Sequence, residues 1–390
     1  MSKIKDKKPD TLLVHAGRDP AAHHGMVNPP VYHASTILFP TLDALHAPDK
    51  PYPYGRRRTP TIAALQDAMT ALEGGHNTVI TPSGLAAVTT ALLAYLKAGD
   101  HLLMTDSVYG PSRHFCDTVL ARFGIEVTYY EPRIGAGIAG LIRDNTKLIF
   151  AESPGSCTFE VQDMPALAQA AHAGGALLMA DNTWASPLFF KPFEHGVDVS
   201  IQAATKYLSG HSDVMLGTVT ATQAAWPALS EVHGSLGLCA GPDDIYLTLR
   251  GIRTLGVRLR QHMQTGLALA RWLAAQPQIA RVLHPGLDSD PGHALWKRDF
   301  LGASGLFGVV LKPCSKTALA AMLDGLELFG MGYSWGGYES LIVPVALRGM
   351  RTATPDSKDG PLLRLHAGLE DIDDLIADLG AGLARLARAA

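Results

Sequence analysis

The stretches ALLMADN (176–182) and DVSIQAATKYLSGHSD (198–213) each begin with a short apolar run and then turn polar. Asp181 and Asn182 follow the first run, and Thr205 and Lys206 follow the second. Short apolar runs that alternate with helical patterns indicate crossover units and parallel strands. Ligands of open α/β sheets bind beyond the carboxyl ends of the strands, so we expect the chemistry to lie at these polar ends.

Three further runs of this kind precede them in the chain. They are HLLMTD (101–106), IEVTYYE (125–131) and KLIFAES (147–153). A helical pattern begins at Thr61, and helical patterns separate the later runs. The sequence therefore predicts an α/β fold with a mostly parallel sheet covered by helices on both faces.

The alternation stops near Gly241-Pro242, where a different pattern begins. Residues 251–275 have apolar side chains at steps of three and four, which predicts one long amphipathic helix. A strand is expected within GLFGVVLK (305–312) and a closing helix from about Asp371. These elements predict a smaller α+β domain at the C-terminal end.

The first sixty residues differ from the rest because they are rich in proline and lack a sustained period. Such an arm commonly lies on another subunit. We therefore predict an arm at 1–60 that contacts a neighbouring subunit, a cofactor-binding domain at 61–248 and a C-terminal domain at 249–390.

Composition narrows the possible partners and compartment. The 390 residues are 47% hydrophobic and carry a formal net charge of −3, so a disordered chain, a nucleic-acid partner and a membrane partner are disfavoured. The four cysteines lie far apart, and no metal-binding spacing, P-loop or GxSxG motif follows a strand. We expect a cytoplasmic protein without a metal site.

Three features at the strand ends carry chemical meaning together. Lys206 at the end of a strand can be desolvated and act as a nucleophile toward carbonyl groups. Asp181 supplies an acid at the end of another strand of the same kind, and Ser83-Gly84 opens a helix whose free N–H groups suit an anion. Each alone is more commonly a solvated lysine, a capping aspartate or a plain helix start. Combined, they are the three parts that a pyridoxal phosphate site requires.

The chain also resembles the pyridoxal-phosphate-dependent enzymes of cysteine and methionine metabolism over nearly its whole length. The matching segments are YGRRRTPT (54–61), TPSGLAAV (81–88), ESPGS (152–156), DNTWASP (181–187), SIQAATKYLSGHSD (200–213), RGIRTLGVRLRQH (250–262), YSWGGYESL (333–341) and RLHAGLED (364–371). The resemblance implies the pyridoxal-phosphate-dependent transferase fold of the aspartate aminotransferase type, fold type I.

The resemblance implies specific roles around the cofactor, pyridoxal 5'-phosphate. Lys206 would bind it covalently and then carry the proton, Asp181 would pair with its ring nitrogen, and Tyr109 would stack on its ring. The groups expected to hold its phosphate are Ser83, Gly84, Leu85 and Thr205, joined by Tyr54 and Arg56 of a neighbouring subunit. The active site would then need a dimer, and the family is commonly a tetramer.

For the substrate, the resemblance implies that Arg364 binds the α-carboxylate with Ser334 beside it. Tyr54 and Trp335 would line the same pocket. Many relatives have serine where Ala203 and His366 stand, so the phosphate and carboxylate contacts are expected to differ there. The roles of His366 and Tyr246 stay open.

The activity implied is that of a cystathionine beta-lyase, which releases L-homocysteine, pyruvate and ammonia from the amino-acid thioether L-cystathionine. Trp335 favours it, because γ-acting relatives more often have a small aliphatic residue there, and Pro111 stands where methionine γ-lyases typically have cysteine. A γ-lyase, a γ-synthase or a cysteine or cystine desulfhydrase is the alternative. A non-catalytic cofactor-binding regulator is the alternative of another class, and the presence of Lys206 counts against it.

Overall fold

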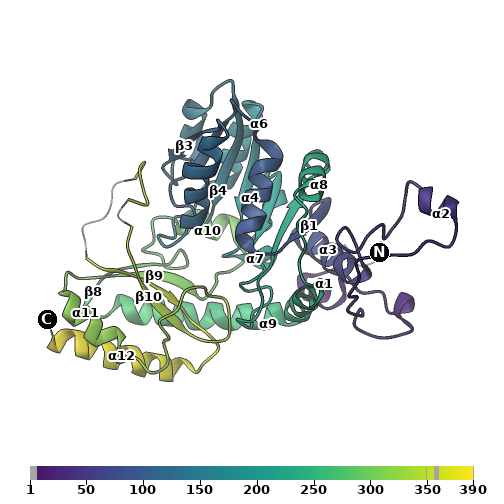
Figure 1. Cartoon of the computed structure of the whole chain (residues 1–390). Coiled ribbons are helices and arrows are strands. Elements are labelled where there is room, and N and C mark those ends of the chain that lie inside the picture. Colours follow the sequence, from purple (N-terminus) through teal and green to yellow (C-terminus); the bar gives the residue numbers. More distant parts are fainter. Residues whose placement is uncertain (1–6, 348, 355–359, 390) are drawn as a thin grey trace.

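The larger of two sheets occupies the upper part of the molecule in Figure 1. The computed structural model describes residues 7–347, 349–354 and 360–389. The strands of this sheet are β1 (Asn77–Thr81), β2 (His101–Thr105), β3 (Glu126–Tyr130), β4 (Thr146–Glu152), β5 (Leu177–Asp181), β6 (Val199–Gln202) and β7 (Gly217–Ala221). Their order is β1-β7-β6-β5-β4-β2-β3, and only β7 runs antiparallel to its neighbours.

Helices cover both faces of this sheet, as the sequence predicts. They are α3 (Pro60–Glu73), α4 (Gly84–Tyr95), α5 (Gly110–Phe115), α6 (Met164–Ala173), α7 (Ser186–Phe189) and α8 (Trp226–Ser235), with shorter turns at Cys116–Leu120, Gly135–Leu141 and Pro192–His195. Alternate side chains of β2 point to opposite faces: Leu103 joins the core under α3 and α6, while Leu102 and Met104 join the core under α4. Because all five residues of β2 are buried, the strand has no solvent-exposed face.

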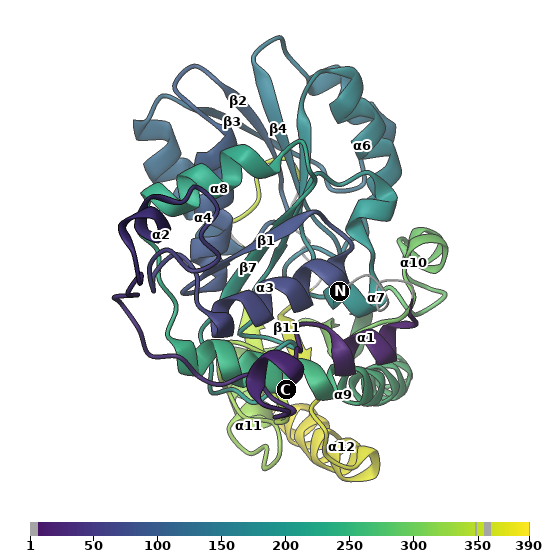
Figure 2. The ribbon, with the colours of Figure 1, turned by 90° about the vertical axis from the view of Figure 1, so that its right-hand side faces the viewer.

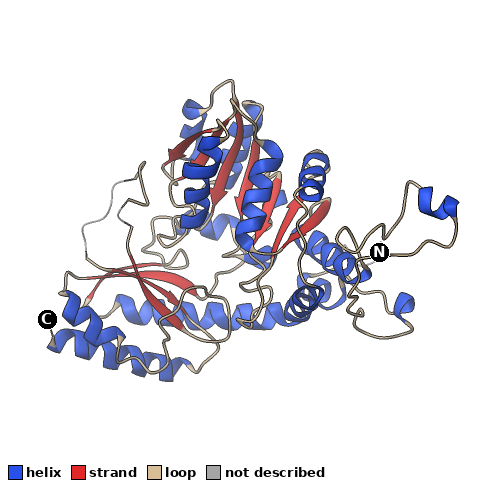
Figure 3. Ribbon diagram, viewed as in Figure 1, coloured by secondary structure: helices blue, strands red, loops and turns tan. Residues whose placement is uncertain are grey.

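A second, antiparallel sheet of four strands lies in the C-terminal part (Figure 3). Its order is β10-β11-β9-β8, formed by β8 (Ile279–Leu283), β9 (Leu306–Leu311), β10 (Leu341–Val345) and β11 (Leu362–His366). The helices of this unit are α11 (Lys316–Leu323) and α12 (Ile372–Arg388), whereas Leu295 and Trp296 of α10 (His293–Asp299) pack on the core of the larger sheet. The predicted strand at 305–312 and the closing helix are therefore present, within a smaller α+β unit.

The long helix α9 (Pro242–Ala274) joins the two units. Its buried face includes Ile252, Leu255 and Leu259, as the apolar spacing predicts. The proposed domain boundary at 248/249 falls inside this helix and stays a prediction.

The N-terminal arm has two parts with different environments. Helix α1 (Pro9–His15) packs on α3 and α9 of its own chain, with Leu12 and Leu13 buried (Figure 2). Arg253 of α9 donates hydrogen bonds to the carbonyls of Leu13 and Ala16. Beyond it, the turn Ala21–His23 and helix α2 (Leu42–His46) extend away from both sheets.

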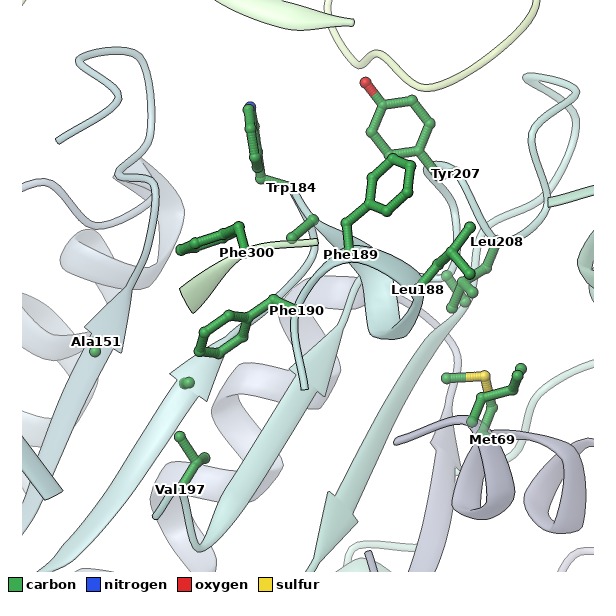
Figure 4. Packing of buried hydrophobic residues seen from close by; sticks show 14 of the residues in the cluster. Met69, Ala151, Trp184, Leu188, Phe189, Phe190, Val197, Tyr207, Leu208 and Phe300 are labelled. Atoms are coloured by element: carbon green, nitrogen blue, oxygen red, sulfur yellow. The ribbon is translucent and has the colours of Figure 1, made fainter. Parts of the chain in front are cut away.

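Aromatic packing fixes the loop that follows β5, close to Asp181. Trp184 is buried, and its indole N–H donates to the carbonyl of Leu306 on β9 at 2.8 Å. Its ring contacts Phe300, which also packs on Phe190 (Figure 4). The hydrogen bond from Trp184 to Leu306 holds the β5 loop against the smaller unit. In the described residues, no helix is long and apolar enough to cross a membrane.

Candidate active site

The polar ends of β4, β5 and β6 come together because these strands are parallel neighbours. Glu152 pairs in register with Asp181 across β4 and β5, and the turn that follows β6 carries Lys206. The smaller unit supplies Ser334, Trp335 and Arg364 opposite them. The site therefore lies where the two units meet.

Lys206 is the centre of this arrangement. Its Nζ donates to Ser334 Oγ at 2.6 Å and lies 5.2 Å from the centroid of the Trp335 ring. Desolvation and the nearby Arg364 lower the pKa of Lys206 to about 8, against the opposing effect of Asp181. Roughly a tenth of this amine is therefore unprotonated at pH 7, far more than for an ordinary lysine, and this is the form that attacks a carbonyl carbon or removes a proton.

Two carboxyl groups, those of Asp181 and Glu152, lie at neighbouring strand ends near Lys206. Desolvation raises the pKa of both, and the neighbouring Asp181 raises that of Glu152 further. Asp181 Oδ1 accepts hydrogen bonds from the Thr183 hydroxyl at 2.5 Å and from the Thr183 N–H at 3.0 Å. These two bonds favour the ionised form of Asp181, so it is the carboxylate suited to pair with a protonated ring nitrogen.

Tyr109 precedes α5, and the residue is 45% exposed. Its N–H donates to Glu152 Oε2 at 2.7 Å, which fixes the backbone of this residue above the carboxyl pair. The exposed ring face is free to stack on a planar ligand. Desolvation raises the pKa of its phenol, which stays protonated at neutral pH.

Arg364 on β11 faces the same space from the smaller unit. Its Nη2 donates to the Ser334 carbonyl at 3.1 Å. Sequence reasoning missed Cys157, whose thiol lies beside this guanidinium: burial raises its pKa, and Arg364 opposes that rise. The only signal was its place directly after the ESPGS segment.

The first turn of α4 lies against the turn that precedes Lys206. Ser83 caps the helix by accepting the Ala86 N–H at 3.1 Å. Within the described chain the N–H groups of Gly84 and Leu85 have no acceptor, and a Cβ on Gly84 would lie 2.5 Å from that of Ala203. This is a cradle that fits a phosphate group. The Thr205 hydroxyl is engaged with both backbone groups of Leu216.

Two predicted residues, Tyr54 and Arg56, are not brought into this group. Arg56 Nη1 donates to the Gly234 carbonyl near the end of α8 at 3.0 Å, and the Tyr54 side chain is 45% exposed. Among the described residues, neither bonds to Lys206, Asp181 or Arg364. Their role toward a second chain stays a prediction.

The donor set suits an organic cofactor. In the part of the chain that is described, no three His, Cys, Asp or Glu side chains gather closely enough to hold a metal ion. An amine, a carboxylate pair, an open aromatic ring and a helix start match the reactive carbonyl, ring nitrogen, ring face and phosphate of pyridoxal phosphate.

Comparisons with known proteins agree with this geometry. Residues 10–384 match the family described as Cys/Met metabolism PLP-dependent enzyme. Cystathionine beta-lyase MetC of Escherichia coli (strain K12) is 48% identical over 394 residues, covering 98% of this chain and 100% of that one. Cystathionine beta-lyase of Salmonella typhimurium is 47% identical with the same coverage. The crystal structure of cystathionine gamma synthase from Xanthomonas oryzae pv. oryzae, in complex with aminoacrylate and cysteine, superposes with a TM-score of 0.90 at 33% identity, covering 98% of this chain and 100% of that chain.

Proposed function

Because the chain belongs to the family of PLP-dependent enzymes of Cys/Met metabolism, we propose that it is a cystathionine beta-lyase. The proposed reaction is the α,β-elimination of L-cystathionine to L-homocysteine, pyruvate and ammonia. Its cofactor is pyridoxal 5'-phosphate, as the family description implies. When bound, this cofactor supplies an electron sink for the pair left by removal of the α-proton.

The roles of the chain's own residues follow from their places. The cradle at Gly84 and Leu85 binds the phosphate, Asp181 holds the proton on the ring nitrogen, and the Tyr109 ring covers one face. Lys206 Nζ attaches the cofactor and, once displaced by substrate, removes the α-proton. Its low pKa, about 8, suits it to accept that proton.

The residues that orient the substrate, Arg364 and Ser334, belong to the smaller unit. Arg364 presents a planar, permanently charged guanidinium to the α-carboxylate. Ser334 Oγ, 2.6 Å from Lys206 Nζ, directs the amine toward the α-carbon.

The position of Trp335 favours β-elimination over γ-elimination. Its ring centroid lies 5.2 Å from Lys206 Nζ, so the indole occupies space beside the base. A γ-elimination also requires a proton to be removed from the β-carbon, which needs a second placement of base and substrate. The indole restricts such a rearrangement and supports the β-lyase assignment.

The proposal includes a dimer whose subunits share active sites, assembled further into a tetramer, in the cytoplasm. The arm supports the shared site: Tyr54 and Arg56 lie apart from their own Lys206, and Met26, Val27 and Leu38 of the arm are strongly exposed. The four cysteines are free, which agrees with a reducing compartment.

A comparison of substrates tests the proposed activity. Purified protein loaded with pyridoxal phosphate is incubated with L-cystathionine, L-cystine or L-cysteine, and the oxo acid is identified. We expect pyruvate, formed most efficiently from L-cystathionine. Higher kcat/KM for cystine or cysteine would instead assign a desulfhydrase.

A further inference from the structure

A cluster of aromatic and imidazole rings lies directly behind Lys206. The Tyr207 ring lies 5.4 Å from that of Trp335, 5.3 Å from that of His262 and 5.8 Å from that of His366, between centroids. The two imidazoles are 5.1 Å apart and buried. No step of the proposed reaction uses either imidazole, yet the cluster packs against the residues that do.

His366 contacts one short loop, Ser334–Gly337. His366 Nε2 lies 3.2 Å from the Gly336 nitrogen and 3.1 Å from the Gly337 carbonyl oxygen, so one tautomer accepts from the Gly336 N–H and the other donates to the Gly337 carbonyl. His366 and Arg364 are two residues apart on β11 and so share one face of the strand. Because Arg364 binds the Ser334 carbonyl, two neighbouring side chains hold this loop at both ends.

The loop in turn lies against the backbone of Lys206. Gly336 has φ +90°, and a Cβ on it would come within 2.9 Å of the Lys206 carbonyl carbon and the Tyr207 nitrogen. Ser334 also has a left-handed backbone, with φ 79°. A non-glycine residue in this conformation is strained and persists only where its surroundings impose it.

We infer that His366 is a positioning residue, which holds Ser334 and Trp335 at their places against the Lys206 amine. This inference rests on the proposed function, because it assigns the loop a part in orienting the base of that reaction. Desolvation and the adjacent His262 lower the pKa of His366 to about 3. The imidazole is therefore neutral at any pH at which the enzyme works, and it holds the loop through one hydrogen bond of Nε2 rather than through charge.

The test compares His366→Leu with a matched control, His262→Leu. His262 belongs to the same buried cluster, but its Nδ1 bonds to the Ala367 carbonyl and not to the loop. Both holoenzymes are assayed for kcat and KM with L-cystathionine, for melting temperature, and for the pH midpoint of the visible absorbance of bound pyridoxal phosphate. We expect both variants to lose similar thermal stability, while only His366→Leu loses kcat, by roughly 10- to 100-fold.

A conservative variant distinguishes hydrogen bonding from packing. The amide of His366→Gln offers a donor and an acceptor at once, so we expect it to recover most of the lost kcat. We also expect the absorbance midpoint to shift in His366→Leu, because Ser334 no longer fixes the amine, and to stay unchanged in His262→Leu.

Equal losses of kcat in His366→Leu and His262→Leu, or an unchanged kcat in a folded His366→Leu, would overturn the inference. If His366→Leu does not fold, His366→Asn carries the same comparison, because its shorter side chain is polar but does not span the distance to the loop. If the wild-type enzyme forms no pyruvate, the proposed function fails. The absorbance midpoints then decide the positioning role separately.

Discussion

The Lys206 amine lies between groups of opposite charge, Arg364 on one side and Asp181 on the other. Desolvation and the guanidinium favour the neutral amine, whereas the carboxylate favours the ammonium form. The balance leaves its pKa at about 8, so modest changes around it alter how much base is available. The reactivity of this residue is therefore a property of both units of the molecule.

Replacement of Lys206 by alanine is expected to abolish elimination. The variant removes both the attachment point of the cofactor and the base, so pyruvate release should fall at least about 1000-fold. Circular dichroism should show an unchanged fold. Undiminished pyruvate release would refute the assignment of this lysine.

Replacement of Arg364 by alanine is expected mainly to raise the KM for L-cystathionine. Loss of charged hydrogen bonds to the α-carboxylate predicts an increase of roughly 10- to 100-fold. Since Arg364 lowers the pKa of Lys206, that pKa should rise in the variant, and the pH optimum should move upward. An unchanged KM in a pH-resolved assay would place carboxylate binding elsewhere.

At the residue scale, Lys206 and Asp181 could be predicted because each follows an apolar run whose strand end could be read from the sequence. Cys157 and the contacts of His366 could not. Cys157 meets Arg364 only through a left-handed turn, with φ 65°, and His366 meets a loop about thirty residues away. Such contacts depend on tertiary packing and leave no local pattern.

Among the elements, the strands of the larger sheet differ in how clearly the sequence predicts them. β2, β4 and β5 are apolar runs that helices bury on both faces, and these were predicted. The sequence pattern does not predict β1, which has the sequence NTVIT, or β7, which has the sequence GTVTA. Their threonines are buried, and Thr78 bonds to Thr220 across the two strands at 2.8 Å. Because hydrogen-bonded hydroxyls fill these buried positions, the two strands lack the apolar run that predicts the others.

The end of α3 carries a buried carboxyl group that makes stability depend on pH. Glu73 accepts hydrogen bonds from Ser200 and Gln202 of β6, and desolvation raises its pKa to about 7. The stability that this raised pKa contributes is complete below about pH 4.5 and is lost as pH rises through 7. Glu73→Gln should therefore gain about 2 kcal/mol relative to wild type between pH 5.5 and pH 8.

Urea unfolding of both proteins at the two pH values measures this difference. A constant difference between Glu73→Gln and wild type would show that Glu73 is ionised throughout. The same experiment tests whether the contact between α3 and β6 tolerates a neutral amide in place of the acid.

The connection between β10 and β11 is held to the larger unit by a buried ion network. Asp106, directly after β2, accepts the N–H groups of Thr352, Ala353 and Thr354 and contacts Arg113. Arg351 Nη1 donates to Glu160 Oε1 at 2.7 Å, and its Nε lies 3.6 Å from Asp106. These bonds fasten a segment of the smaller unit beside the loops that carry Tyr109 and Cys157.

Arg351→Ala should lower the free energy of unfolding by about 2 kcal/mol, because it leaves Glu160 without its buried partner. Arg133→Ala removes an exposed ion pair with Glu131 and provides the control, with an expected change below about 1 kcal/mol. Denaturant midpoints give both values. Equal effects of the two substitutions would mean that the buried network contributes little.

For the whole molecule, the central structural expectation is that two chains share each active site. The α1 part of the arm packs on its own chain, whereas Tyr54 and the exposed apolar residues of the arm have no such cover among the described residues. The sequence indicated an arm through its prolines, but its periodicity could not reveal that α1 belongs to the local core. Whether two chains share each active site can be tested without a structure of the complex.

Mixing two inactive variants tests the sharing directly. Lys206→Ala and Tyr54→Ala, unfolded and refolded together, should form hybrid dimers in which one of the two sites has both native residues. With random pairing, about one quarter of wild-type activity should return. If the mixture stays inactive while hybrid dimers are present, Tyr54 serves its own chain's site.

The products formed from L-cystathionine test the account most directly. Wild-type holoenzyme is incubated with this substrate, and the oxo acid and the released thiol are quantified by mass spectrometry, with Lys206→Ala as the control. The account predicts pyruvate and homocysteine in equal amounts, and neither from the variant. Predominant 2-oxobutyrate with cysteine would contradict it, because those products require cleavage at the γ-carbon.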